Sequence, residues 1–183
     1  MRRAVAALLT AAAAAAATTC TGSLEGAVCT SPLDFVLLVD NSQGMAPYTE
    51  EITIFMRSFV ESFALSAQGP NVAVVLFNSA SEVRVGLSYN TSALLEGIYR
   101  PLNPQYGTSM RAGFETARDL LLASERSGYA APMVLLLSDG LSNTPTYRGC
   151  ETGACQLALL AESTLKVHGI AIFWISYKLP NSF

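Results

Sequence analysis

The sequence predicts an α/β fold: a doubly wound, mostly parallel sheet with one antiparallel edge strand. Two unbroken aliphatic runs, at residues 35–39 and 133–137, have the pattern of strands that are buried on both faces. Between such runs lie stretches with an apolar residue at every third or fourth position, as in amphipathic helices. Strands that alternate with helices in this way indicate parallel pairing. The 183 residues are enough for one domain with a substantial core.

The expected elements follow in the order β-α-β-β-α-α-β-α-β. The first strand covers residues 33–39, and apolar spacing predicts a helix over 48–66 that Gly69-Pro70 breaks. Two strands follow with only a short turn between them, which predicts an antiparallel hairpin whose second strand lies at an edge of the sheet. The strands after the first are expected at 71–77, 83–87, 133–137 and 170–177, and the later helices at 92–99, 109–124 and 156–167.

The N-terminus has the three parts of a secretory signal peptide. Residues 1–3 are basic, residues 4–17 are apolar and mostly alanine, and residues 18–23 are small and polar. We therefore expect a signal peptide at 1–23, a domain at 24–183, and a secreted or cell-surface protein. The apolar run is shorter than the roughly 20 residues of a spanning helix, so we expect no membrane span in the mature chain. An uncleaved signal anchor and a lipoprotein at Cys20 are the alternatives.

The charge of the mature chain argues against nucleic acid as a partner. Removing Arg2 and Arg3 from the 11 basic residues leaves 9 against 14 acidic ones, a net charge of −5. No basic patch is visible in the sequence, and such a patch is what nucleic-acid binding requires. Asn90 begins the one sequon for N-glycosylation, Asn-Thr-Ser.

The four cysteines, an even number, suit an oxidising compartment. We favour the disulfides Cys20–Cys29 and Cys150–Cys155 over the other two connectivities, because each pair is close in sequence. A zinc site is the competing interpretation. It lacks a Cys-x-x-Cys motif, and the single histidine, His168, lies elsewhere.

Three oxygen-rich segments lie at or near the ends of predicted elements. They are 40–44 (Asp-Asn-Ser-Gln-Gly) after the first strand, 107–109 (Gly-Thr-Ser) at the start of a helix, and 138–140 (Ser-Asp-Gly) after the fourth strand. Ligands of open α/β sheets bind outside the carboxyl ends of the strands. Carboxylates and hydroxyls without His or Cys suit a hard divalent cation. Each segment also has a purely structural interpretation, as a helix cap or a turn.

Taken together, these segments resemble the metal-ion-dependent adhesion site of von Willebrand factor type A domains, the Rossmann-like fold shared with integrin I domains. The family's first loop reads Asp-x-Ser-x-Ser, and Asp40 and Ser42 match its first two ligand positions. Thr108 resembles the family's threonine from a later loop, and Asp139 resembles its aspartate after the fourth strand. The resemblance covers residues 33–177 and implies weakly bound Mg²⁺, or Mn²⁺ or Ca²⁺.

One position departs from the family pattern. The third residue of the first loop should be serine and is Gly44, which removes one hydroxyl ligand. A water can occupy that place, because such cations readily keep several waters. We therefore expect weaker metal affinity. The resemblance further implies that the open coordination position accepts a carboxylate from an extracellular protein.

The family fold continues past the fifth strand with a helix, a sixth strand and a final helix, whereas this sequence stops at Phe183. We therefore expect a domain that is incomplete at its C-terminus. Residues 170–175 are apolar at every position, so we expect the last strand to be exposed along one edge and to favour self-association.

These observations favour a binding module for adhesion without catalytic chemistry. A metal-free structural module of the same fold, used for assembly, is the second hypothesis. A metal-dependent phosphatase of the haloacid dehalogenase type is the enzyme alternative, but it needs a second aspartate where Ser42 stands and a catalytic lysine. A serine hydrolase needs a histidine base, and His168 lies in the wrong region.

Overall fold

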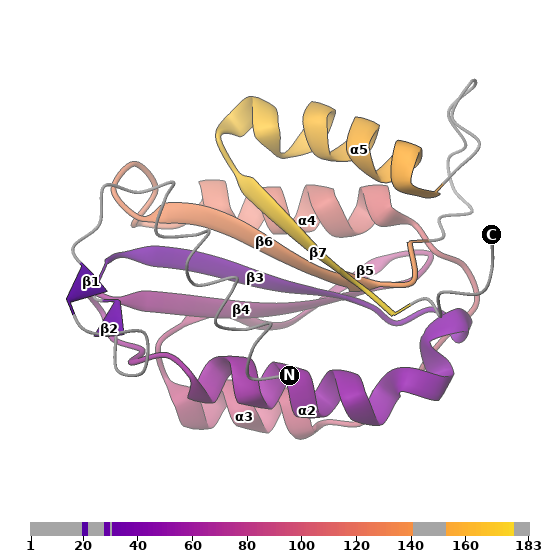
Figure 1. The fold of residues 1–183 in the computed structure, drawn as a ribbon, viewed down its shortest axis with the longest axis horizontal. Helices are drawn as coiled ribbons and strands as arrows, with labels where there is room; N and C mark the ends of the chain where they lie inside the picture. Colours follow the sequence, from indigo (N-terminus) through magenta and orange to yellow (C-terminus); the bar gives the residue numbers. More distant parts are fainter. Residues whose placement is uncertain (1–19, 22–27, 30, 141–152, 178–183) are drawn as a thin grey trace.

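The computed structural model describes residues 20–21, 28–29, 31–140 and 153–177, and its elements follow the predicted alternation (Figure 1). The strands are β1 (Cys20–Thr21), β2 (Val28–Cys29), β3 (Leu33–Asp40), β4 (Pro70–Phe77), β5 (Ser81–Ser88), β6 (Ala131–Ser138) and β7 (Ala171–Ser176). The α-helices are α2 (Thr49–Glu61), α3 (Thr91–Tyr99), α4 (Met110–Leu122) and α5 (Gly153–Thr164), and the 3-10 helices are η1 (Gln43–Tyr48) and η2 (Lys166–His168).

Five strands of the described chain form one sheet in the order β5-β4-β3-β6-β7, and β1 pairs separately with β2. The central strand β3 is parallel to β4 and β6, and β6 is parallel to β7. Only β5 is antiparallel in this sheet, and it lies at an edge, as its alternating sequence predicts. The predicted fold class is therefore confirmed.

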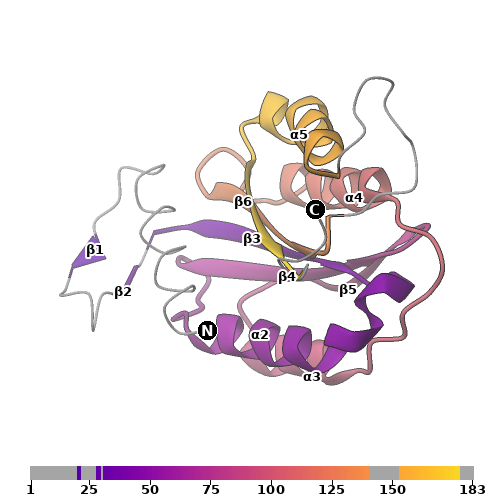
Figure 2. The ribbon, with the colours of Figure 1, turned by 45° about the vertical axis from the view of Figure 1, so that its right-hand side comes forward.

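The helices cover both faces of the sheet. Figures 1 and 2 show α2 and α3 on one face and α4 and α5 on the other. Successive side chains of β3 point to opposite faces, so Phe35 packs with Phe59 of α2, while Val36 belongs to a second core with Phe114 of α4 and Leu160 of α5. A strand between two cores needs an apolar residue at every position, which explains the unbroken aliphatic run.

Helix α2 ends at Glu61, earlier than the predicted end at Ser66. The Ser62 hydroxyl and the Ser62 N–H both donate to the Phe59 carbonyl, at 2.7 and 3.1 Å, and such local bonds compete with continued helix. Phe63 still packs against the first core although it lies outside the helix. The apolar spacing therefore continues past the point at which the helix ends.

The last strand, β7, borders β6 and has no second strand partner within the described residues. Phe173 and Ile175 lie against the first core, and Ile172 and Trp174 against the second, but all four stay partly exposed. The Trp174 ring packs onto Gly140, whose φ of +80° suits glycine, and Trp174 Nε1 donates to the Ser138 carbonyl at 3.1 Å. Strand β7 thus supports the turn that follows β6.

The cysteines are only partly covered by the structure. Cys155, in α5, is disulfide-bonded, whereas Cys150 lies outside the described residues, so this pairing stays a prediction. Cys20 and Cys29 stand opposite each other in the backbone register of β1 and β2, which is compatible with the other predicted pair. No helix in the described ranges combines the length and the apolar character that crossing a bilayer requires.

Candidate metal centre

The parallel register brings the predicted aspartates together at the carboxyl-terminal ends of the strands. Asp40 is the last residue of β3 and pairs with Phe77, the last residue of β4. Ser138 ends the neighbouring strand β6, and its hydroxyl donates to Asp40 Oδ2 at 2.7 Å. Asp139 follows directly and interacts electrostatically with Asp40. Two carboxylates that are about a hundred residues apart in sequence therefore meet at the carboxyl ends of adjacent strands.

The Asp40 carboxylate is buried and lacks a cationic partner among the described residues. Its Oδ1 accepts a hydrogen bond from the Ser42 N–H at 2.9 Å, and the Ser42 hydroxyl also bonds to the carboxylate. Burial raises the pKa of Asp40, and the negative charge of Asp139 raises it further, while the bonds from Ser42 and Ser138 act in the opposite direction. This part of the molecule would be stabilised by a positive charge.

Gly44 faces the Asp139 carboxylate and the Ser42 hydroxyl. A Cβ atom built on Gly44 would lie 3.1 Å from Asp139 Oδ2 and 3.9 Å from Ser42 Oγ. The position that carries the third hydroxyl in the family pattern is therefore directed at the predicted site. The φ angle of Gly44 is not positive, so the backbone does not require glycine there. The departure from the pattern changes the ligand set at a position whose backbone conformation serine can also adopt.

The loop with Thr108 is bonded to the chain that follows β4, at the same ends of the strands. The Ser109 N–H donates to the carbonyl of Asn78, which follows the last residue of β4, and Gly107 has a φ of +88°. Ser109 caps α4, because its hydroxyl accepts a hydrogen bond from the Ala112 N–H at 3.3 Å. Thr108 is buried and is not the cap. The predicted role of this segment as a helix cap is thus filled by Ser109 and not by Thr108.

Two features of the site were not predicted from the sequence. Ser138 holds Asp40, a contact that depends on the pairing of β3 with β6. Asn41 anchors the first loop to the chain before Thr108: its Nδ2 donates to the Asn103 carbonyl at 3.1 Å, and its carbonyl accepts from the Gln105 N–H at 2.9 Å. The side-chain types in the two loops offered no signal for these contacts.

The residues present fit a hard divalent cation. Across the described ranges, no group of three or more Asp, Glu, His or Cys side chains could hold a metal, so two carboxylates would be joined by hydroxyls and water. Asp40, Ser42, Thr108 and Asp139 are the predicted residues that would hold such an ion. A bound cation would supply an open coordination position for an oxygen ligand of a partner.

Known structures share this fold. Residues 35–141 match the family model of the von Willebrand factor type A domain. Manganese-loaded TRAP from Plasmodium vivax has a TM-score of 0.65 and 24% identity, and the alignment covers 84% of this chain and 61% of that one. For proximal thread matrix protein 1 from the mussel byssus, with a zinc-occupied MIDAS motif, the values are 0.65, 20%, 81% and 39%. For the vWF domain of the pilus tip protein Mfa5 from Porphyromonas gingivalis, they are 0.56, 22%, 65% and 43%.

This chain spans less than two thirds of the length of each of these three proteins. No curated protein matches the sequence. The family model covers more than half of the chain, and the five-stranded mixed sheet is the fold that the similar structures share. The chain therefore belongs to the von Willebrand factor type A family.

Proposed function

We propose that this protein is an extracellular adhesion module that binds a protein partner through a divalent cation held by Asp40, Ser42, Thr108 and Asp139. The cation is Mg²⁺, Mn²⁺ or Ca²⁺, and the partner contributes a carboxylate. The observation that carries the proposal concerns Asp40. Its carboxylate is buried next to that of Asp139, and Asp40 has no cationic partner in the described chain. A divalent ion removes the repulsion between the two carboxylates.

The similar structures support this function. One is manganese-loaded and another has a zinc-occupied MIDAS motif. A pilus adhesin, SpaC from Lactobacillus rhamnosus GG, is also similar, with a TM-score of 0.53. The oxygen-only ligand set of this chain favours a hard cation over zinc.

Calorimetry with Mg²⁺ and Mn²⁺ on EDTA-treated protein tests the proposal. We expect weak binding heat and a higher melting temperature at millimolar metal. Asp139→Ala should abolish both responses, and should raise the melting temperature of the metal-free protein because it removes a charge that repels Asp40. Asp119→Ala, at an exposed position of α4, is the matched control and should keep the metal response. Folded protein that shows neither heat nor a melting shift would refute metal binding.

A metal-free structural module is the second candidate, and one observation favours it. Both oxygens of the Asp40 carboxylate already accept hydrogen bonds from the chain, from Ser42 and Ser138. Such bonds stabilise a buried carboxylate without a metal. The same titration separates the two candidates, because only the adhesion module responds to metal.

We infer no catalytic role. Ser42 stands where a phosphatase of the haloacid dehalogenase type needs its second aspartate. His168, the only histidine of the sequence, precedes β7. It therefore lies at the amino-terminal ends of the parallel strands, whereas Asp40 lies at their carboxyl-terminal ends. A histidine base is therefore remote from the predicted site. Phosphatase activity that requires Asp40 would contradict this inference.

Secretion is part of the same proposal. The predicted signal peptide, the disulfide-bonded Cys155 and the facing positions of Cys20 and Cys29 support it. Asn90 is exposed at the start of α3, where its Oδ1 accepts from the Ala93 N–H at 3.2 Å. Peptide mapping of non-reduced secreted protein from a eukaryotic host should find Cys150–Cys155 and a glycan on Asn90. Cys20–Cys29 is expected only where the signal peptide is cleaved before Cys20, because cleavage after residue 23 removes that cysteine. Free thiols at Cys150 and Cys155 would contradict secretion.

A further inference from the structure

We infer that a second surface takes part in binding: a groove between α2 and residues 99–102, which we call the α2 groove. We propose that it holds an extended stretch of the same partner whose carboxylate reaches the candidate metal centre. This inference rests on the proposed function. It specifies which residue types the partner carries near its metal-binding carboxylate.

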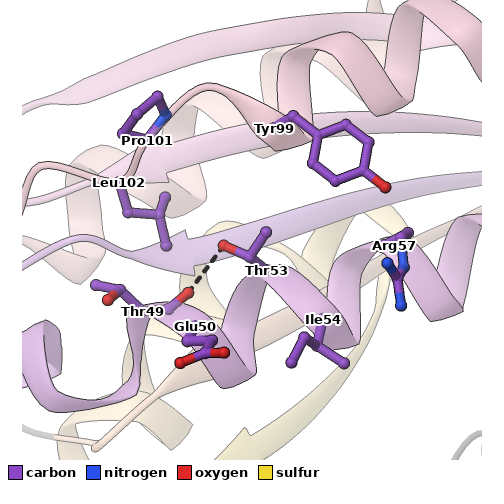
Figure 3. Close-up of a pocket in the computed structure, with 8 residues that line it drawn as sticks. All are labelled: Thr49, Glu50, Thr53, Ile54, Arg57, Tyr99, Pro101 and Leu102. Carbon is purple, nitrogen blue, oxygen red and sulfur yellow. Dashed lines mark hydrogen bonds between the residues drawn. The ribbon is translucent and has the colours of Figure 1, made fainter.

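The α2 groove is a cavity of about 320 Å³ on the outside of the domain (Figure 3). Its two walls come from separate parts of the chain, with Thr49, Thr53 and Arg57 on the α2 side and Tyr99, Pro101 and Leu102 on the other. Tyr99 is 56% exposed, although it sits at the end of a helix that packs on the core. An exposed aromatic ring beside a cavity is a feature of binding surfaces.

Hydrogen bonds to β5 fix one wall of the groove, and the other wall is helix α2 itself. On one side, Arg84 of β5 donates through Nη1 to the Arg100 carbonyl at 2.8 Å, and Arg100 donates through Nη2 to the Arg84 carbonyl at 2.8 Å. On the other, the Thr53 hydroxyl donates to the Thr49 carbonyl at 2.8 Å, the bond drawn in Figure 3. A preformed groove loses less conformational entropy when it binds an extended peptide.

Both walls continue directly into the candidate metal centre. Helix α2 follows the Asp40–Gly44 loop through η1. The chain after Leu102 runs to Asn103 and Gln105, whose backbone groups bond to Asn41. The groove is therefore joined to the candidate metal centre along the chain on both sides, through η1 on one and through residues 103–105 on the other.

The lining of the groove defines the chemistry of its occupant. Glu50 lies next to Thr49 and Arg57 lies towards the other end of the groove, so we expect the acidic residue of the partner at the Arg57 end. Leu102 and Ile54 are partly exposed apolar side chains that suit an aliphatic or aromatic residue. Arg57, at the other end, has the exposed Glu61 as its nearest carboxylate, at 3.9 Å. Such a weak surface pair leaves the guanidinium available to an acidic residue of the partner.

The length of the groove limits the motif. From Thr49 to Arg57, α2 rises roughly 12 Å at 1.5 Å per residue. This length accommodates about three or four residues of extended chain. We therefore expect the partner to carry a metal-binding carboxylate and, in the stretch that occupies the groove, an apolar residue followed by an acidic residue within about four positions.

Selection from a displayed library of random peptides on Mn²⁺-loaded protein tests the inference. Thr53→Glu fills the groove and places a carboxylate four residues before Arg57, where it pairs with the guanidinium. Ser58→Glu introduces the same charge on α2 outside the groove and is the matched control. We expect wild type and Ser58→Glu to enrich peptides with a metal-binding carboxylate and the apolar–acidic stretch, and Thr53→Glu to bind those peptides at least about tenfold more weakly. Melting curves establish that both variants fold.

EDTA separates this inference from the proposed function. Peptides that are released by EDTA and still bind Thr53→Glu would overturn the groove and support the metal site. Peptides that depend on Thr53 and ignore EDTA would support the groove and refute its link to the metal centre. If no peptide is enriched over an unrelated protein, the groove proposal is wrong. Tyr99→Ala, which removes the opposite wall, should weaken binding in the same way as Thr53→Glu.

Discussion

Ser138 gives the sharpest test of how this site is built. Its hydroxyl is fully buried, donates to Asp40 Oδ2 at 2.7 Å and accepts from the Gly140 N–H at 3.0 Å. Ser138→Ala removes both bonds and leaves a buried carboxylate oxygen and a buried N–H without them. A hydrogen bond to a charged group contributes about 1.5–3 kcal/mol, and a neutral one about 0.5–1.5 kcal/mol. We therefore expect a loss of roughly 2–4 kcal/mol in the free energy of unfolding.

The chain contains a matched control. The Ser124 hydroxyl donates to Asp34 Oδ2 at 2.8 Å and accepts from the Arg126 N–H at 3.1 Å, the same arrangement at the other end of β3. Asp34 also forms an ion pair with Arg126, at 3.5 Å, whereas Asp40 has no such partner in the described chain. Ser124→Ala should thus destabilise the protein less, because its carboxylate keeps the guanidinium.

Urea unfolding in EDTA measures both losses, and metal titration separates their meaning. Ser138→Ala should also weaken Mn²⁺ binding, because a bond that favours the charged form of Asp40 is gone and its pKa rises further. Ser124→Ala should leave Mn²⁺ affinity unchanged. If Ser138→Ala and Ser124→Ala lose the same stability and bind Mn²⁺ with the same affinity, our account of Asp40 as a buried charge that a cation stabilises is wrong.

Three further predictions follow from single features. Gly44→Ser should tighten Mn²⁺ binding by about 1 kcal/mol, roughly fivefold, after Asp139 Oδ2 yields by a few tenths of an ångström; unchanged affinity in calorimetry would mean that the hydroxyl does not reach the ion. Burial, assisted by Glu51, raises the pKa of Tyr177 to about 12. The stability contributed by the neutral phenol is thus complete below pH 10 and is lost as the pH rises towards 12. Tyr177→Phe should therefore resist alkaline unfolding in urea better than wild type. The control Tyr106→Phe, at an 81% exposed position, should unfold like wild type. The edge of β7 that has no strand partner in the described part of the chain should cause self-association that grows with concentration in light scattering. A monomer at every concentration would show that this edge is covered.

The order of strands and helices could be predicted from the sequence because each element carries its own pattern. The run at 35–39 is apolar throughout since both faces of β3 are covered, and the spacing in α2 repeats once per turn since only one side of that helix meets the core. The helix end was less predictable. Phe63 keeps the spacing after the backbone has left the helix, because packing and helical hydrogen bonds are separate requirements.

The site divides in the same way. The sequence by itself determined the residue types, their places after the strands and the departure at Gly44, because residues that follow parallel strands gather at one edge of the sheet. Only the tertiary structure decided that Ser138 bonds to Asp40 and that Gly44 faces Asp139. It also assembled the α2 groove from α2 and the chain after α3. Contacts between residues far apart in sequence depend on which strands pair and on the paths of the loops, and the local spacing of residue types specifies neither.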